Sequence, residues 1–98
     1  MKVLADISII PIGAGDSLSP YIAACQRVFT EAGLEPRLHA FGTNVEGEWA
    51  QVMDAVRRCH EVVHGMGAPR VTATVKLSTR VDRDQSLAAK IESVRDKA

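Results

Sequence analysis

The residues that could do chemistry in this chain are polar side chains set within short segments rich in β-branched residues. Asp6 and Ser8 lie in the first such segment, Asn44 and Glu46 in a middle one, and Lys76 in the last. If carboxylates, an amide, a hydroxyl and an ammonium share one surface, they could bind a small ligand rich in nitrogen and oxygen. The alternative is a solvated surface with cross-strand ion pairs such as Asp6–Lys76.

Candidates for metal binding and covalent catalysis are weak. His60 and His64 are spaced i, i+4 with Cys59 beside them, but no second pair of ligands is evident, so we expect no metal site. We interpret Cys25 and Cys59 as small buried hydrophobic residues. No Ser/His/Asp set or close acid pair can be placed, so the sequence favours a non-catalytic role.

A glycine-containing segment, Gly13-Ala14-Gly15, precedes a predicted helix. Phosphate binds at helix N-termini of this kind. The segment lacks the complete phosphate-loop or dinucleotide-binding pattern, and a strained turn is the favoured interpretation.

Length and charge limit the classes of protein to consider. The 98 residues fit one domain, residues 1–98, and Lys plus Arg equals Asp plus Glu at 12 each. Nucleic-acid and anionic-membrane binders usually carry a basic excess, so we expect neither partner. Asp6 comes too early for the apolar region of a secretory signal, and a cytoplasmic location is expected.

Periodicity and turn residues predict the order of the elements. The predicted elements are a strand over 3–12, a helix that begins at Ser19-Pro20 and ends at Gly33, two short strands within 37–46 around a tight bend at Gly42-Thr43, a helix over about 48–64, a strand over 70–81, and a polar helix over roughly 85–97. Ser19 is expected to cap the first helix with its hydroxyl. Asp82-Arg83-Asp84 is expected to start the last one.

This order is β-α-β-β-α-β with an extra C-terminal helix. Two β-α-β halves with right-handed crossovers give an α+β, ferredoxin-like split β-α-β sandwich, in which two helices cover one face of a four-stranded antiparallel sheet. Odd-numbered residues of the last strand should face the helices. The opposite, open face of the sheet is half apolar, and such a face is commonly buried against a second subunit.

Several motifs in this chain occur together in one known family. They are Pro11, Gly13, Gly15, Ser17, Ser19 and Tyr21 at alternate positions, then Gly42-Thr43 with Glu46-Gly47, His60-Glu61, and Arg70-Val71 followed by Lys76 and Arg80. In order and spacing the set resembles the small thiamine-binding protein family, long catalogued as a domain of unknown function. The resemblance implies a ferredoxin-like protomer that pairs through its sheet into homodimers or homotetramers. It also implies binding of thiamine or its hydroxymethylpyrimidine moiety near subunit contacts, without established catalysis.

Thiamine carries an aminopyrimidine and a permanently charged thiazolium. Glu46 could pair with the amino group, Glu46 or Asp6 could offset the thiazolium charge, and Phe41 could stack on a ring. The candidate ligand-binding residues are Ser8, Ile10, Gly13, Ser19, Phe41, Gly42, Thr43, Asn44, Glu46 and Lys76. We expect no cofactor, because thiamine itself would be the bound ligand, and no catalytic residue.

Two alternatives stay open from the sequence. One is a small enzyme on the same fold that uses His39 or Glu46 as an acid or base at a subunit boundary. The other is an oligomerisation or regulatory module without a small ligand. Storage, delivery and sensing are equally compatible with a thiamine binder, and so are several forms of the vitamin.

Overall fold

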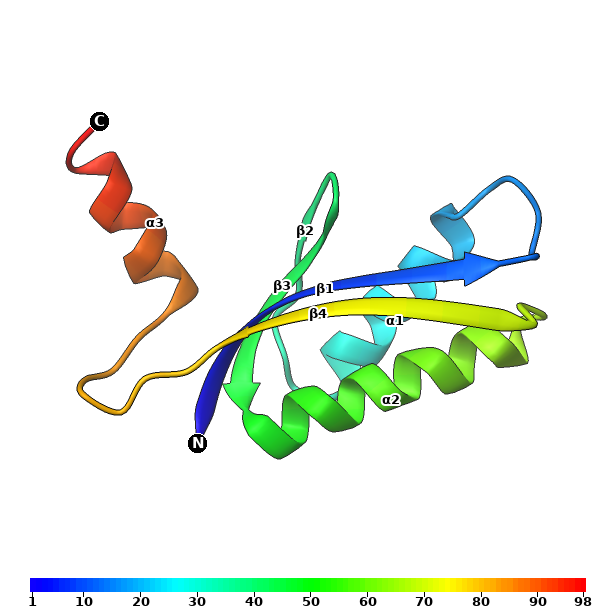
Figure 1. The fold of residues 1–98 in the computed structure, drawn as a ribbon, viewed down its shortest axis with the longest axis horizontal. Helices are drawn as coiled ribbons and strands as arrows, with labels where there is room; N and C mark the ends of the chain where they lie inside the picture. Colours follow the sequence, from blue (N-terminus) through cyan, green and yellow to red (C-terminus); the bar gives the residue numbers. More distant parts are fainter.

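The computed structural model describes all 98 residues and has the predicted element order. The elements are β1 (Lys2–Ile12), α1 (Ser19–Glu31), β2 (Arg37–His39), β3 (Gly42–Glu48), α2 (Trp49–Gly65), β4 (Arg70–Ser78) and α3 (Leu87–Arg95). Helices α1 and α2 lie together on one side of the sheet (Figure 1). The ferredoxin-like α+β fold with an added C-terminal helix is therefore confirmed. No helix of the chain is long and apolar enough to cross a membrane.

The sheet is antiparallel and its strands lie in the order β2-β3-β1-β4. Pairing between β1 and β3 runs from Lys2 opposite Glu48 to Ile7 opposite Thr43. Pairing between β1 and β4 continues to Ile12. Strand β1 is therefore longer than its β3 neighbour, and its last residues have a strand partner on one side only.

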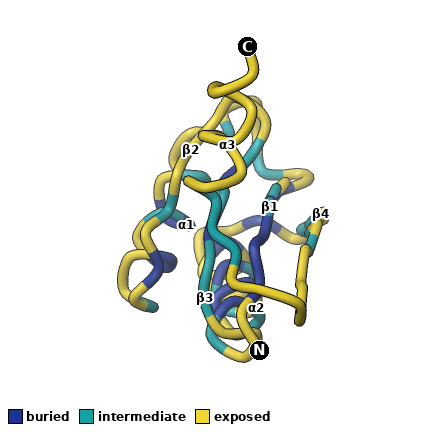
Figure 2. The backbone as a smooth tube through the Cα atoms, turned by 90° about the vertical axis from the view of Figure 1, so that its left-hand side faces the viewer, coloured by how far each residue is buried: buried dark blue, intermediate teal, exposed yellow.

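The hydrophobic core lies between the sheet and the two main helices. Val3, Ala5, Ile7 and Ile9 contribute alternate side chains of β1, and each is at most 7% exposed. They pack against helix residues such as Phe29, which is 1% exposed. In Figure 2 the buried stretches are concentrated in β1 and the helix segments below it, whereas α3 is exposed from its second residue on. The predicted alternation of β1 and β4 is confirmed by these burial patterns.

Helices α1 and α2 begin and end through different capping interactions. Glu48 and Gln51 form a capping box at the start of α2, with the Glu48 N–H donating to Gln51 Oε1 at 3.2 Å. Gly33 adopts φ +80° just after α1, as expected of a helix terminator. The predicted Ser19 cap is wrong. The N–H groups of Tyr21 and Ile22 both donate to the carbonyl oxygen of Leu18, which places the boundary one residue earlier.

The hairpin between β2 and β3 turns two residues earlier than predicted. Residues 40–41 form the turn, and Gly42 is the first residue of β3. A Cβ at Gly42 would lie 2.9 Å from the Ile7 carbonyl oxygen, closer than any side chain tolerates. Glycine is therefore needed here for close approach to β1, and the predicted bend at Gly42-Thr43 is wrong.

The C-terminal segment departs most from expectation. Strand β4 ends at Ser78 instead of residue 81, and Ser86 caps α3 by accepting a hydrogen bond from the Ala89 N–H at 3.0 Å. The predicted start at 82–84 is wrong because Ser86 provides the cap, while the Asp82 carboxylate accepts hydrogen bonds from Arg80, which lower its pKa to about 2. Helix α3 extends away from the rest of the molecule (Figure 1). Its apolar residues, Val94 among them, are exposed.

Candidate functional site

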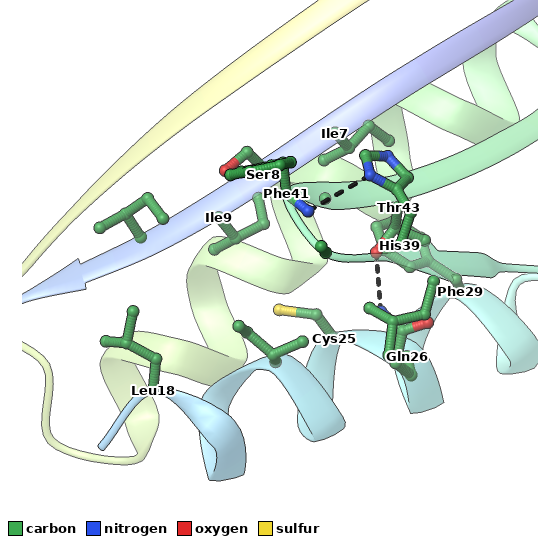
Figure 3. Close-up of a pocket in the computed structure, with 15 residues that line it drawn as sticks. Ile7, Ser8, Ile9, Leu18, Cys25, Gln26, Phe29, His39, Phe41 and Thr43 are labelled. Atoms are coloured by element: carbon green, nitrogen blue, oxygen red, sulfur yellow. Dashed lines mark hydrogen bonds between the residues drawn. The ribbon is translucent and has the colours of Figure 1, made fainter.

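A cavity of about 300 Å³ opens where β1 extends beyond β3. Its walls are the second half of β1, the first turns of α1, and the β2–β3 hairpin, as the close-up in Figure 3 shows. Ile9 lies on the strand side, and Leu18 and Ile22 on the helix side. Ten of the fifteen lining residues are hydrophobic, and neither lysine nor arginine is among them. Mostly apolar walls with a few placed polar groups are typical of small-molecule sites.

A directed pair of polar side chains lies on one wall of this cavity. Gln26 Nε2 donates to Thr43 Oγ1 at 2.8 Å, and it joins α1 to β3 (Figure 3). Since Thr43 uses an oxygen lone pair for this bond, its hydroxyl hydrogen remains available for another acceptor. Gln26 also keeps its carbonyl oxygen as an acceptor. The Thr43 hydroxyl, as a donor, and the Gln26 carbonyl oxygen, as an acceptor, are thus available next to each other. Ser8 adds a second hydroxyl from β1.

The position of the hairpin is fixed by a short chain of hydrogen bonds. The Phe41 N–H donates to His39 Nδ1 at 3.3 Å, and His39 Nε2 lies 2.7 Å from Asp6 Oδ1. Because Nδ1 accepts, the ring proton is on Nε2 and is donated to the Asp6 carboxylate. Asn44 Nδ2 also donates to Asp6 Oδ1, at 3.3 Å. Asp6 on β1 therefore orients His39, whose ring lines the cavity.

The mouth of the cavity is apolar and exposed. The Phe41 side chain at the hairpin tip is 88% exposed, and Leu38 is 63% exposed. Ile10 and Ile12, near the end of β1, are each 39% exposed. A group of exposed apolar side chains around one opening is typical of a surface that contacts a ligand or another protein.

The thiol at the cavity wall is buried and hydrogen-bonded to a second thiol. Cys25 lines the cavity and is 3% exposed, and Cys59 on α2 is fully buried. A hydrogen bond with Cys25, together with burial, raises the pKa of the Cys59 thiol. The same hydrogen bond lowers the pKa of Cys25. The burial of both side chains agrees with the small buried residues expected at these positions.

Five of the ten predicted ligand-binding residues line this cavity. They are Ser8, Ile10, Phe41, Gly42 and Thr43. Gln26 was missed, because a single glutamine in the middle of a helix gives no signal in the sequence. Its place one residue after buried Cys25, and four after Ile22, is the only hint that it borders the core.

The other five predicted residues lie elsewhere. Asn44 and Lys76 border a shallower depression of about 220 Å³ on the open face of the sheet. Glu46 is engaged within the chain: it pairs with Lys2 at 3.1 Å and Arg37 at 3.9 Å, and its Oε1 accepts from the N–H of the first α3 residue. The residues predicted to form one polar site on the open face are thus divided between the cavity and the shallower depression.

The remaining two predicted residues line neither hollow. Gly13 has φ +77° in the turn after β1, and a Cβ there would lie 3.1 Å from Pro69 Cγ, so its role is conformational. Ser19 is exposed in the first turn of α1. The anticipated ion pair between Asp6 and Lys76 does not form, although the two residues are opposite each other in the sheet, because Asp6 is bonded to His39.

No group of three metal-ligating side chains lies together in the structure. His64, one of the pair considered from the sequence, has its Nδ1 2.8 Å from the Ala68 carbonyl oxygen, just beyond the end of α2. That contact joins the helix to the following loop and gives His64 a structural role.

The arrangement defines a class of protein: a small ferredoxin-like domain with a mostly apolar cavity beside strand β1. Among solved structures it is similar to a hypothetical protein of Methanocaldococcus jannaschii, with a TM-score of 0.90 and 30% identity over 97% of both chains. A Thermotoga maritima protein assigned provisionally to thiamine biosynthesis or salvage has the same fold. Its TM-score is 0.82 at 20% identity, over 97% of this chain and 100% of the other.

The sequence itself gives the family. The family described as Thiamine-binding protein matches residues 5–95. A UPF0045 protein of a Synechocystis strain is 49% identical over 94 residues, which cover 96% of this chain and 78% of that relative. The chain therefore belongs to the thiamine-binding protein family, and the resemblance seen in its motifs is confirmed.

Proposed function

We propose that this protein binds thiamine or its hydroxymethylpyrimidine moiety, without changing it chemically, in the cavity between β1, α1 and the β2–β3 hairpin. The observation that carries the proposal is the cavity itself, because apolar walls, a directed Gln26–Thr43 pair and an exposed aromatic ring meet there in a member of this family. Storage, delivery or sensing of the vitamin in the cytoplasm would each need only reversible binding.

The chemistry of the walls suits the two rings of thiamine. A volume of about 300 Å³ is at the lower end for ligand pockets and is compatible with a ligand that leaves part of itself at the mouth. The Phe41 ring at the mouth could stack on the thiazolium, whose permanent positive charge is attracted to an aromatic face. The absence of lysine and arginine from the lining favours the unphosphorylated vitamin over its phosphate esters.

The proposal includes self-association. Phe41 and Leu38 expose most of their side chains beside the cavity mouth, and burying them against a second copy would remove apolar surface from water. A homodimer or homotetramer would thereby close the cavity with a partner subunit. This arrangement places the ligand near a subunit contact without requiring the open face of the sheet to be the site.

The experiment is isothermal titration calorimetry with thiamine on the wild type and Phe41→Ala. Phe41 is 88% exposed and contributes nothing to the core, so the variant should keep its unfolding temperature. Loss of ring stacking should weaken binding by about 1 kcal/mol. Val81→Ala is the matched control, because Val81 is 97% exposed and does not line the cavity. Wild-type protein that takes up no thiamine would refute the proposal.

A second candidate is favoured by one contact. The Asp6–His39 pair places an oriented imidazole on the cavity wall, which a general acid or base requires. Mass analysis of thiamine and its precursors after incubation separates the two functions: an altered ligand indicates an enzyme, and an unaltered bound ligand indicates a binder. Native mass spectrometry tests the third possibility, since an assembly that neither retains nor accepts a ligand would indicate an oligomerisation module.

A further inference from the structure

The main chain of Ile9 is the least expected polar feature of the cavity. In an antiparallel pair, residues opposite each other alternate between those that exchange two hydrogen bonds and those that exchange none. The Trp49 N–H donates to the Met1 carbonyl oxygen at 2.9 Å, and the β1–β3 register continues from there to Ile7 opposite Thr43. The odd-numbered residues of β1 therefore direct their N–H and C=O groups toward β3. Ile9 is the next in that series.

No part of the hairpin pairs with Ile9. Its partner in register would be Phe41, but β3 begins at Gly42 and no main-chain hydrogen bond joins Ile9 to the hairpin. The Phe41 N–H is turned instead to His39 Nδ1, at 3.3 Å. Ile9 is only 7% exposed, and the part of it that is not packed in the core borders the cavity. Buried main-chain groups are almost always paired, and the Ile9 N–H and C=O have no partner within the chain.

Pro11 supports the same orientation. A proline within a strand lacks a donor and is found where its nitrogen faces an unpaired edge. Ile10 and Ile12 pair with β4, and Pro11 between them directs its nitrogen to the same side as the Ile9 N–H. A peptide strand could not add here either, because Pro11 supplies no donor for the next rung of a ladder. The edge therefore offers a single donor, the Ile9 N–H, next to the Ile9 carbonyl oxygen, which suits a small ring.

We propose that the Ile9 N–H and C=O recognise a heteroaromatic ring in which an acceptor nitrogen adjoins an exocyclic amino group. The N–H would donate to the ring nitrogen, and the amino group would donate to the carbonyl oxygen, so the ligand continues the sheet where β3 stops. Asp6 and His39 act as positioning residues, because they hold the Phe41 N–H away from β1. This inference rests on the proposed function and names the atoms by which the aminopyrimidine of thiamine would be read.

The test combines two ligands with three proteins. The ligands are thiamine and an analogue in which the ring nitrogen beside the amino group is replaced by C–H. Ile9→Pro removes the N–H without breaking a sheet hydrogen bond, because that N–H faces the unpaired edge. Ile9→Ala is the control, since it removes a similar amount of side chain and keeps the N–H. Circular dichroism and thermal unfolding establish that each variant is folded before titration.

Wild type and Ile9→Ala should each prefer thiamine over the analogue by about tenfold, the worth of one well-placed hydrogen bond. Ile9→Pro should bind both with equal affinity. If Ile9→Pro fails to fold, the preference of the wild type for thiamine over the analogue decides alone. Equal affinity of the wild type for the two ligands overturns the inference but leaves the proposed function intact. A wild type that binds neither ligand overturns both.

Discussion

The Gln26–Thr43 hydrogen bond offers the sharpest quantitative prediction, because it joins α1 to β3 at the wall of the cavity. Thr43→Val preserves the shape of the side chain and removes the hydroxyl. Thr43 is only 4% exposed, so Gln26 would lose a partner that water replaces incompletely. Because Gln26 is itself half-buried and can turn its amide toward solvent, we expect a loss of about 1 kcal/mol in the free energy of unfolding, not the full penalty of a stranded donor.

Urea unfolding followed by tryptophan fluorescence measures this change, since Trp49 is the single tryptophan and lies at the start of α2. Thr43→Ser is the matched control, because it keeps the hydroxyl and loses only a methyl group. A double-mutant cycle with Gln26→Met isolates the bond itself, with an expected coupling energy of about 0.5–1 kcal/mol. Thiamine affinity should fall by about tenfold in Thr43→Val and much less in Thr43→Ser. A coupling energy near zero, or equal affinities of the two variants, would refute this assignment.

Two further predictions concern residues outside the cavity. Glu46→Gln should leave thiamine affinity unchanged. Loss of the half-exposed ion pair with Lys2 should lower the free energy of unfolding by less than about 1 kcal/mol, and loss of the contact with α3 should accelerate hydrogen exchange in that helix. Weaker thiamine binding by this variant would show that Glu46 belongs to the site. Because the pKa of Cys59 is raised in the folded state, its contribution to stability is complete below the ordinary thiol pKa near 9 and is lost as pH rises above it. The pKa of the hydrogen-bonded Cys25 is lowered, and this partly offsets the loss. Stability above pH 9 should still fall more steeply in wild type than in Cys59→Ala, and parallel curves by urea unfolding would contradict this.

The fold could be predicted because its signals are local and periodic. The alternation of β4, the apolar periodicity of the main helices and the glycine after α1 each report a conformation of the segment itself. Element order then restricts the topology to very few alternatives. The hairpin turn was misplaced because Gly42 resembles a turn residue, whereas its lack of a side chain is needed against the Ile7 carbonyl oxygen across the sheet.

The candidate site could be predicted only in part, because a cavity depends on where one strand ends relative to another. Sequence patterns identified the hairpin residues and Ser8, but not that β3 stops short of Ile9. The groups that were not predicted are the main chain of Ile9 and a single polar residue on a helix, Gln26, both proposed to contact the ligand. Such roles leave no pattern in residue type or spacing. Glu46 lies apart from the cavity for the converse reason: its carboxylate pairs with Lys2 and Arg37, which only the folded chain brings close to it.

The location of the ligand is the central claim, and amide chemical-shift mapping tests it most directly. Two-dimensional spectra of ¹⁵N-labelled protein titrated with thiamine report every main-chain N–H at once. The largest shifts should fall on Ile9, Phe41 and Gly42, which line the cavity. Shifts concentrated instead at Asn44 and Lys76 on the open face, or no shifts at saturating thiamine, would contradict it.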